Sequence, residues 1–175
     1  MNFESIPPVW LDETDSTNAE AMRMLKRGKP MEGSCIVARY QSEGRGQRSN
    51  HWNSRPGENL LASFILYPPE SVARHPFLLS KSVALAVHGT LQHFTPGRVQ
   101  IKWPNDILIN EKKAAGILIE NQWLGSQWYA AVVGIGVNVN QREFKLEHAT
   151  SLASNTTGVI TPETVLSELQ SQLSK

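Results

Sequence analysis

The residues best suited to chemistry lie in the segment YQSEGRGQRSNHW, from Tyr40 to Trp52. Two arginines, Arg45 and Arg48, are opposed there only by Glu43, and further arginines flank the segment. A guanidinium binds phosphate or carboxylate through paired N–H donors, and closure of a loop removes competing water. The composition therefore predicts a loop that closes over an anionic ligand. For an arginine-rich loop considered alone, a solvated surface turn is the alternative.

The glycines of this loop do not indicate a common nucleotide-binding fold. Gly44, Gly46 and Ser49 have a spacing similar to a dinucleotide fingerprint, but that fingerprint must open a helix so that the pyrophosphate meets the helix N-terminus. Here the following residues, WNSRPGENLLASFIL, predict a turn and a strand. The sequence also has no Gly-Lys-Ser/Thr of a P-loop. Both of these folds are excluded on sequence context.

A second cationic segment, from Ile101 to Asn121, places Lys102 at the end of an expected strand and Lys112 and Lys113 at an expected hairpin turn. Side chains alternate along an extended chain, so only one of the two adjacent lysines can face a given site. Each lysine alone is typical of a solvated surface charge. Two cationic segments in one small chain favour a shared site for an anion.

The elements that must position these residues alternate between helices and strands, with strands dominating the middle of the chain. Helices are expected at about Asn18–Arg27, at His75–Phe94 and from Thr161–Pro162 onward. Thr17 and Glu20 have the spacing of a capping box for the first helix, and Phe77, Ala84, Leu91 and Phe94 lie on one face of the second. Strands are expected at 34–40, 59–66, 99–103, 107–109, 114–120 and 128–139. This order predicts an α+β fold in which helices pack on one face of a sheet.

Composition sets the class of protein. The chain has 175 residues, 40% apolar residues and a net charge of +1, enough for one domain with a core but not for a basic nucleic-acid coat. Cys35 is the single cysteine, and the five histidines show no metal-site spacing. We found no signal peptide pattern and no run of about 18 apolar residues, so a cytoplasmic protein is expected.

Five short segments, DSTN, YQSEGRGQRSNHW, KWPNDILINEKKAAGILIE, GIGVNVNQ and ATSL, occur in the order and approximate spacing of biotin–protein ligases, the biotin–[acetyl-CoA-carboxylase] ligases. The resemblance runs from about Thr14 to Gly158. It implies a class II synthetase-like catalytic domain with a mixed β-sheet and helices on one side. It also implies a reaction of biotin with ATP to give biotinyl-5′-AMP, which then acylates a lysine of a biotin carboxyl carrier domain.

The resemblance assigns roles residue by residue. Lys113 and Arg45 are the implied catalytic residues, with Lys113 bridging the biotin carboxylate and the α-phosphate. The implied biotin-binding residues are Ser16, Thr17, Gln41, Gly44, Arg45, Gly46, Trp52, Lys113, Gly116, Gly134 and Gly136. The implied nucleotide-binding residues are Arg48, Lys102, Asn105, Asp106, Asn138 and Phe144, with Asp106 also a candidate for linkage to the Mg²⁺ of ATP.

The sequence departs from the family pattern in its loop and at both ends. Gln47 and Asn50 replace two arginines of the common pattern, which removes two cations, and Ser49 replaces a glycine. A left-handed conformation at Ser49 would cost about 1 kcal/mol. The expected organisation is a single catalytic domain over residues 1–175 without an N-terminal helix-turn-helix domain, with the C-terminal SH3-like domain absent or truncated. This describes either a minimal ligase or a fragment.

Two alternative functions stay open on sequence. Lipoate–protein ligases and octanoyltransferases share the architecture, and the transferases use a cysteine nucleophile. Cys35, however, lies in an apolar strand typical of a core residue. A nucleic-acid module could also carry an arginine-rich loop, and its binding would weaken steeply with salt. We expect no nucleic-acid or membrane partner, and the resemblance allows a homodimer in which WYAAVVGIGVNV supplies an exposed strand.

Overall fold

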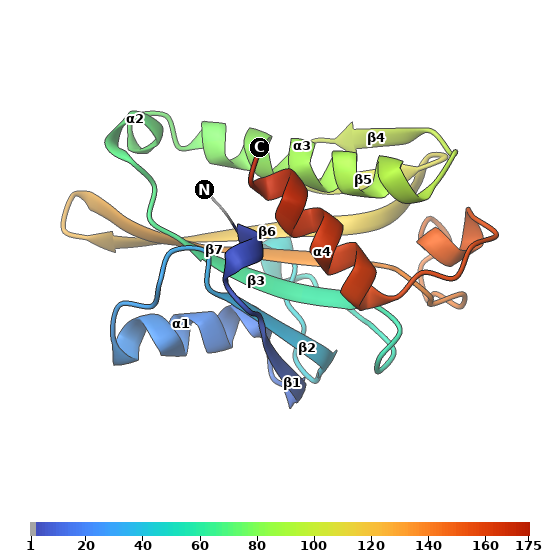
Figure 1. The fold of residues 1–175 in the computed structure, drawn as a ribbon, viewed down its shortest axis with the longest axis horizontal. Helices are drawn as coiled ribbons and strands as arrows, with labels where there is room; N and C mark the ends of the chain where they lie inside the picture. The colour runs from blue at the N-terminus through green and yellow to red at the C-terminus, as the bar shows by residue number, and fades with distance from the viewer. Residues whose placement is uncertain (1–2) are drawn as a thin grey trace.

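The structure, a computed structural model, describes residues 3–175, and a seven-stranded mixed sheet runs through it in the order β1-β2-β3-β7-β6-β5-β4 (Figure 1). Only β1 and β2 pair in parallel, and every other neighbouring pair is antiparallel. The strands are β1 (Val9–Thr14), β2 (Cys35–Gln41), β3 (Leu60–Leu66), β4 (Val99–Lys102), β5 (Asp106–Ile109), β6 (Lys112–Leu124) and β7 (Gln127–Val137). The helices are α1 (Thr17–Arg27), α2 (Glu70–Ala73), α3 (Phe77–Phe94) and α4 (Pro162–Leu173), with short 3-10 turns η1 (Phe3–Ser5), η2 (Gln47–Ser49) and η3 (Leu152–Ser154).

The two faces of the sheet are covered differently. Alternate residues of β3 and β7, such as Phe64 and Val133, pack with α3 and α4 into the main core. The residues between them face the other way, where Ile65 and Val132 form a small cluster with Ala21 of α1. Figure 1 shows α3 and α4 on one side of the sheet and α1 on the other. The α+β class with a mixed sheet is confirmed, while α1 departs from the expected placement of all helices on one face.

Helix α1 begins where the sequence predicts, but its N-terminus differs from the expected capping box. Ser16 is the N-cap residue, and Thr17 is the first residue of the helix. The Thr17 hydroxyl donates to Gln41 Oε1 at 3.0 Å, and Glu20 pairs with Arg23 at 2.6 Å. The capping box of Thr17 and Glu20 is therefore wrong, because both side chains bond to other partners. Gly28 follows the helix as expected.

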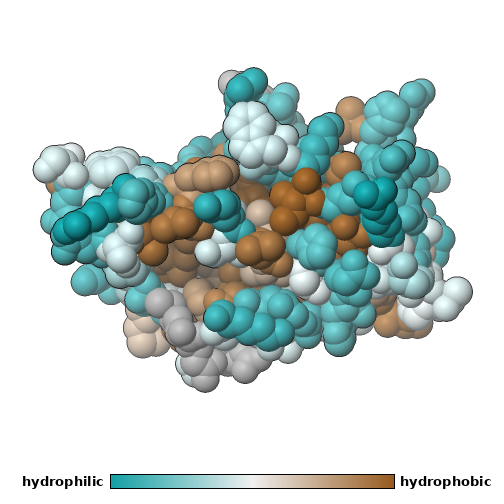
Figure 2. Space-filling view, turned by 90° about the horizontal axis from the view of Figure 1, so that it is seen from above, coloured by the Kyte–Doolittle hydropathy of each residue, from teal (hydrophilic) through white to brown (hydrophobic). Residues whose placement is uncertain are grey.

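Helix α3 covers the expected residues but turns a different face to the core. Leu91 is buried, as expected, whereas Phe77 is 55% exposed and Val83 and Val87 are buried instead. Helix α4 begins after Thr161, whose hydroxyl accepts from the Thr164 backbone N–H. Figure 2, which views the molecule from the α3 side, shows apolar residues in the middle of this face with hydrophilic residues around them.

The β5–β6 hairpin turns at Asn110 and Glu111, whose φ values are 49° and 68°. Two consecutive residues with positive φ are typical of the type I′ turn that joins paired strands. Lys112 and Lys113 therefore lie in β6 and not in the turn, which corrects the expectation. Lys112 is exposed and Lys113 is half-buried, as alternation along a strand requires.

Strand β7 lies inside the sheet. Its residues from Ala131 to Val137 pair with β3 on one side and with β6 on the other. The expectation that this segment supplies an exposed strand for dimerisation is therefore wrong, because its backbone groups are already bonded.

Among residues 3–175, none of the helices has both the length and the apolar character needed to span a membrane.

Candidate active site

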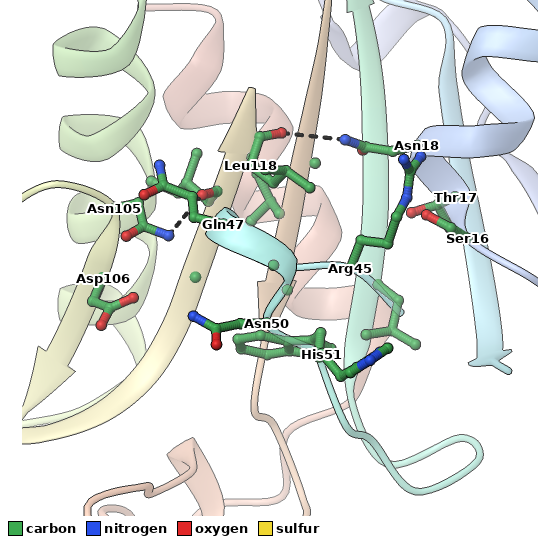
Figure 3. A pocket seen from close by; sticks show the side chains of 18 of the residues that line it. Ser16, Thr17, Asn18, Arg45, Gln47, Asn50, His51, Asn105, Asp106 and Leu118 are labelled. Atoms are coloured by element: carbon green, nitrogen blue, oxygen red, sulfur yellow. Dashed lines mark hydrogen bonds between the residues drawn. The ribbon is translucent and has the colours of Figure 1, made fainter. Parts of the chain in front are cut away.

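A cavity of about 340 Å³ opens on the α1 face of the sheet, in the part that α1 leaves uncovered. The N-terminus of α1, the loop after β2 and the strands β5 and β6 contribute its walls, while β7 contributes its floor. Figure 3 shows Ser16, Thr17 and Asn18 on one side, Asn105 and Asp106 on the other, and the turn that carries Gln47 between them. The cavity thus joins segments that are far apart in the sequence.

One end of the cavity is polar and rigid. The Thr17 backbone N–H and hydroxyl both donate to Gln41 Oε1, at 2.7 and 3.0 Å. Ser16, Thr17 and Gln41 are each at most 9% exposed. Because Gln41 accepts both hydrogen bonds through its oxygen, its amide N–H₂ group is left as a donor. This end can bond a small polar group that carries both donors and acceptors.

The floor of the cavity is built from glycines that allow larger groups to approach the sheet. A Cβ atom at Gly116 or Gly136 would lie 2.8 or 2.6 Å from the Trp52 ring. A Cβ atom at Gly134 would collide with Asn18 Oδ1. Only glycine fits these contacts, so the indole of Trp52 lies directly against β6 and β7. The buried Trp52 indole N–H has no hydrogen-bond partner among the described residues.

The other end of the cavity carries charge. Lys113 Nζ lies 2.7 Å from Asp106 Oδ1 and 5.5 Å from the centre of the Trp52 ring. The Lys113 and Asp106 side chains are 32% and 23% exposed, so water screens this pair only in part. Asn105 is tied to the sheet, since its side-chain amide donates to the Ile117 carbonyl at 3.1 Å. A cation is thus held at the edge of the cavity, close to an aromatic wall.

The loop after β2 folds back on itself above the cavity. The Gly46 backbone N–H donates to the Asn50 carbonyl at 2.7 Å, and the Trp52 N–H donates to the Gly44 carbonyl at 2.9 Å. Gly44 packs against the Trp52 backbone, and a side chain there would collide with it. In the η2 turn, Arg48 adopts the left-handed conformation, with a φ of 53°. The left-handed conformation considered for Ser49 in the sequence analysis is therefore adopted by Arg48.

A second cavity of about 500 Å³ adjoins the first and shares His51, Trp52 and Lys113 with it. Asn138 and Phe144 line it. The Asn138 side chain is buried and donates to the Thr150 carbonyl at 3.0 Å. Lys113 and Trp52 are thus placed at the junction of two spaces.

The structure brings most of the expected site residues together. The first cavity is lined by Ser16, Thr17, Gln41, Arg45, Gly46, Arg48, Trp52, Asn105, Asp106, Lys113, Gly116, Gly134 and Gly136. Gly44 and Lys102 line neither cavity: Gly44 packs within the loop against the Trp52 backbone, and Lys102 is exposed at the end of β4. Further lining residues were assigned no binding role from the sequence, among them Asn18, Gln47, Asn50, His51, Leu61, Trp103 and Leu118. Of these, Asn18 could have been predicted as a site residue, since it follows Thr17 in the DSTN segment.

Comparison with known proteins agrees with this geometry. Residues 10–138 match the Biotin/lipoate A/B protein ligase family. The chain belongs to this family. It is 42% identical over 132 residues to the biotin–[acetyl-CoA-carboxylase] ligase of Paracoccus denitrificans, which covers 74% of this chain and 53% of that protein. It is 37% identical over 134 residues to the bifunctional ligase/repressor BirA of Bacillus subtilis, which covers 77% of this chain and 41% of that protein.

The fold of this ligase family member is also found in solved structures. The biotin protein ligase from Aquifex aeolicus in complex with biotin and ATP matches with a TM-score of 0.77 and 34% identity, over 95% of this chain and 68% of that chain. The biotin protein ligase from Leishmania major in complex with biotin matches with a TM-score of 0.75 and 25% identity, over 95% and 72%. The chain spans about half the length of the curated relatives named above.

Proposed function

We propose that this chain activates biotin with ATP to give biotinyl-5′-AMP and transfers the biotinyl group to a lysine of a biotin carboxyl carrier domain. The observation that carries the proposal is the position of Lys113, at the junction of two adjoining cavities and beside Trp52. A bisubstrate reaction needs two neighbouring sites with a cation where the reacting anions meet. The named relatives and the Aquifex aeolicus ligase with biotin and ATP support the same assignment.

The first cavity suits biotin. Its polar end, formed by Ser16, Thr17 and Gln41, offers the donors and acceptors that a ureido group requires. Gly134 and Gly136 let Asn18 and the Trp52 indole come close to β7, and a flat bicyclic ring in this cavity would pack beside that indole. A biotin bound in this way directs its carboxylate away from the polar end, toward the charged end of the cavity.

The second cavity suits the nucleotide. Asn138 and Phe144 line it, and Arg48 and Asn105 face the adjoining cavity. Lys102 lines neither space, so it is left out of the proposed nucleotide site. The Arg55 guanidinium pairs with Glu143 and so connects the two loops that border this cavity.

The chemistry of the first step is the attack of a carboxylate on an α-phosphate, which needs no protein nucleophile. Position and charge must supply the rate, and Lys113 is placed to stabilise both anions as they approach. Among residues 3–175, no three His, Cys, Asp or Glu side chains gather as a metal site. Mg²⁺ is part of the proposal as the ion that accompanies ATP, held mainly by phosphate oxygens, with Asp106 of the first cavity as the candidate protein ligand.

The second step is the attack of a carrier lysine on the mixed anhydride, from which AMP leaves. The protein's part is again to hold the anhydride and exclude water, a role that we assign to the loop residues from Arg45 to Trp52 that line the cavity. We propose the cytoplasm as the location, as the compartment that would supply both ATP and a carboxylase carrier domain. A single catalytic domain over residues 1–175 and a homodimer remain proposals of the same kind.

Transfer of lipoate or octanoate is the alternative within the family. Only an octanoyltransferase would need a cysteine nucleophile, and Cys35 is 1% exposed and packs in the main core on the α3 and α4 face. Burial raises the pKa of the Cys35 thiol, which keeps it protonated. The cavity lies on the opposite face of the sheet, so Cys35 cannot reach a bound acyl group.

The deciding experiment is to mix the protein with magnesium-ATP and either biotin or lipoate, and to detect the acyl-adenylate by mass spectrometry. We expect biotinyl-AMP from biotin and much less product from lipoate. A dominant lipoyl-AMP product, or no adenylate with either acid, would overturn the proposal. Addition of a biotin carboxyl carrier domain should then convert the adenylate into a carrier that is heavier by one biotinyl group.

A further inference from the structure

The Arg45 guanidinium forms an ion pair that faces away from the charged end of the cavity. Arg45 Nη1 lies 3.3 Å from Glu120 Oε1, and the two side chains are 44% and 28% exposed. Figure 3 shows the Arg45 side chain extended toward Asn18, on the side of the cavity opposite Asp106. The arginine that would bind the biotinyl carboxylate is therefore already occupied by a carboxylate of the protein.

Glu120 is fixed in place by a buried amide. The Asn18 amide nitrogen donates to Glu120 Oε2 at 2.7 Å and to the Leu118 carbonyl at 3.3 Å. Both partners can only accept, so the amide nitrogen must face them. The amide oxygen then accepts from the Ser63 hydroxyl at 2.6 Å. Asn18 is 3% exposed, so this orientation is locked within the protein.

Glu120 thus divides its two oxygens between two partners. Oε2 is held by Asn18, and Oε1 is presented to Arg45 at the rim of the cavity. If the loop moves and carries Arg45 with it, Glu120 stays bonded to Asn18 and the ion pair with Arg45 is broken. Arg45 can bind a substrate anion only by leaving Glu120, because one guanidinium edge cannot serve both at full strength.

We propose that Glu120 is the resting counter-ion of Arg45, and that the carboxylate of the acyl substrate must displace it. Glu120 in this view tunes the affinity for the substrate anion: an anion that binds Arg45 must compete with Glu120 for the guanidinium, whereas a neutral group leaves the Arg45–Glu120 pair intact. The inference rests on the proposed function, because the displacing anion is the biotin carboxylate. Glu120 lowers the affinity for that anion and leaves the affinity for an uncharged analogue unaffected.

The test compares biotin with its uncharged methyl ester in isothermal titration calorimetry, on the wild-type protein and on Glu120→Gln. Glutamine keeps an oxygen for Asn18 but removes the charge that holds Arg45. We expect Glu120→Gln to bind biotin about three- to fivefold more tightly, the range for a partly exposed ion pair, and the ester unchanged. Glu168→Gln is the matched control, since Glu168 is half-buried on α4 and bonds to Gln172.

A double-mutant cycle separates this role from a structural one. In an Arg45→Ala background, Glu120→Gln should no longer change the affinity for biotin. If Glu120→Gln does not fold, Glu120→Asp serves instead, because its shorter side chain keeps the charge but cannot span Asn18 and Arg45. Equal effects on biotin and its ester, or weaker binding of biotin alone, would overturn the role of Glu120. A wild-type protein that binds neither ligand would instead overturn the proposed function, and the inference with it.

Discussion

The Lys113 ammonium lies 2.7 Å from the Asp106 carboxylate, across the pairing of β6 with β5. The same relationship holds at the other side of the cavity, where Arg45 pairs with Glu120. The two cations implied to be catalytic, Lys113 and Arg45, are thus each paired with a carboxylate of the protein. Such pairing keeps a long basic side chain ordered before substrate arrives, and the pair opens when a stronger or better placed anion binds.

Lys113→Ala should abolish most of the adenylation. Negative charge is shared between the biotin carboxylate and the α-phosphoryl oxygens in the transition state, where an ammonium between them is worth most. Removal of such a donor costs on the order of 10²–10³ in rate. The measurement is pyrophosphate release at saturating biotin and ATP, and the variant should still acylate a carrier slowly from preformed biotinyl-AMP.

Lys112→Ala is the control for this substitution, because Lys112 is its exposed neighbour on β6. It should change the rate little. Equal losses in the two variants, or a Lys113→Ala enzyme at full rate, would contradict the bridging role of Lys113.

Gln47→Arg should slow the release of biotinyl-AMP. Gln47 lines the cavity in a loop where the sequence lacks an arginine common in the family, so the substitution adds a charge-assisted bond to the anhydride. Stopped-flow or filter-binding off-rates of labelled biotinyl-AMP measure the effect. An off-rate that stays the same or increases would argue against it.

The loop from Tyr40 to Trp52 should become more protected when biotinyl-AMP binds. Its glycines and polar side chains give it few apolar contacts of its own, so the ligand is needed to order it fully. Hydrogen exchange measured by mass spectrometry, with and without the adenylate, reports on this. Identical protection in the two states would show that the loop is already ordered.

Gly134→Ala should weaken biotin binding and destabilise the fold. The added Cβ atom would collide with Asn18 Oδ1, which is locked by Ser63, so either the sheet or α1 must move. Overpacking of this kind costs about 1–3 kcal/mol. Urea unfolding and biotin titration test both effects, with Gly28→Ala as the control, since no atom lies within 4 Å of a Cβ there. Wild-type values for Gly134→Ala would mean that the contact relaxes freely.

The Asp15 carboxylate should make stability depend on pH in the acid range. Hydrogen bonds from Arg23, which donates to both carboxylate oxygens, hold the pKa of Asp15 well below its ordinary value. A folded-state pKa below the unfolded one, about 3.9, gives stabilisation that is complete above that pH and is lost as the pH falls. The side chain is 40% exposed, so solvent screening limits the gain to about 1 kcal/mol.

Urea midpoints of the wild-type protein and of Asp15→Asn measure this contribution. The gap between the two proteins should be widest near pH 7 and narrower at pH 3. A gap that stays constant over this range would indicate that the ionised form of Asp15 contributes nothing.

The fold was predictable where local pattern and tertiary packing agree. The strands β2, β3 and β7 are apolar runs that both faces of the sheet bury, and α4 combines a capping threonine with periodic leucines. The prediction failed where a distant partner outweighs a local rule. Thr17 was expected to cap α1, but its hydroxyl bonds to Gln41, which lies 24 residues later in the sequence. Spacing within a segment cannot show such a contact.

The site was predictable to the extent that its residues lie in recognisable segments. Lys113 and Trp52 lie in such segments, and the structure places them together. Glu120 is the last residue of one of these segments, but the sequence assigned it no role, because a single glutamate after an apolar run has no local feature that indicates a partner. Its importance arises only from register, which puts it on the same face as Gly116 and next to Asn18.

The turn at Asn110 and Glu111 has a consequence that reaches well beyond its own residues. Together with the irregularity between Ile107 and Leu108, it sets which residue of β6 stands opposite each residue of β5. A slip of one residue would exchange the two faces of the strand and bring Lys112 into the cavity in place of Lys113. The strand register alone therefore determines which of two adjacent lysines faces the cavity. The residues that set this register, in the turn and at the irregularity of β5, line neither cavity.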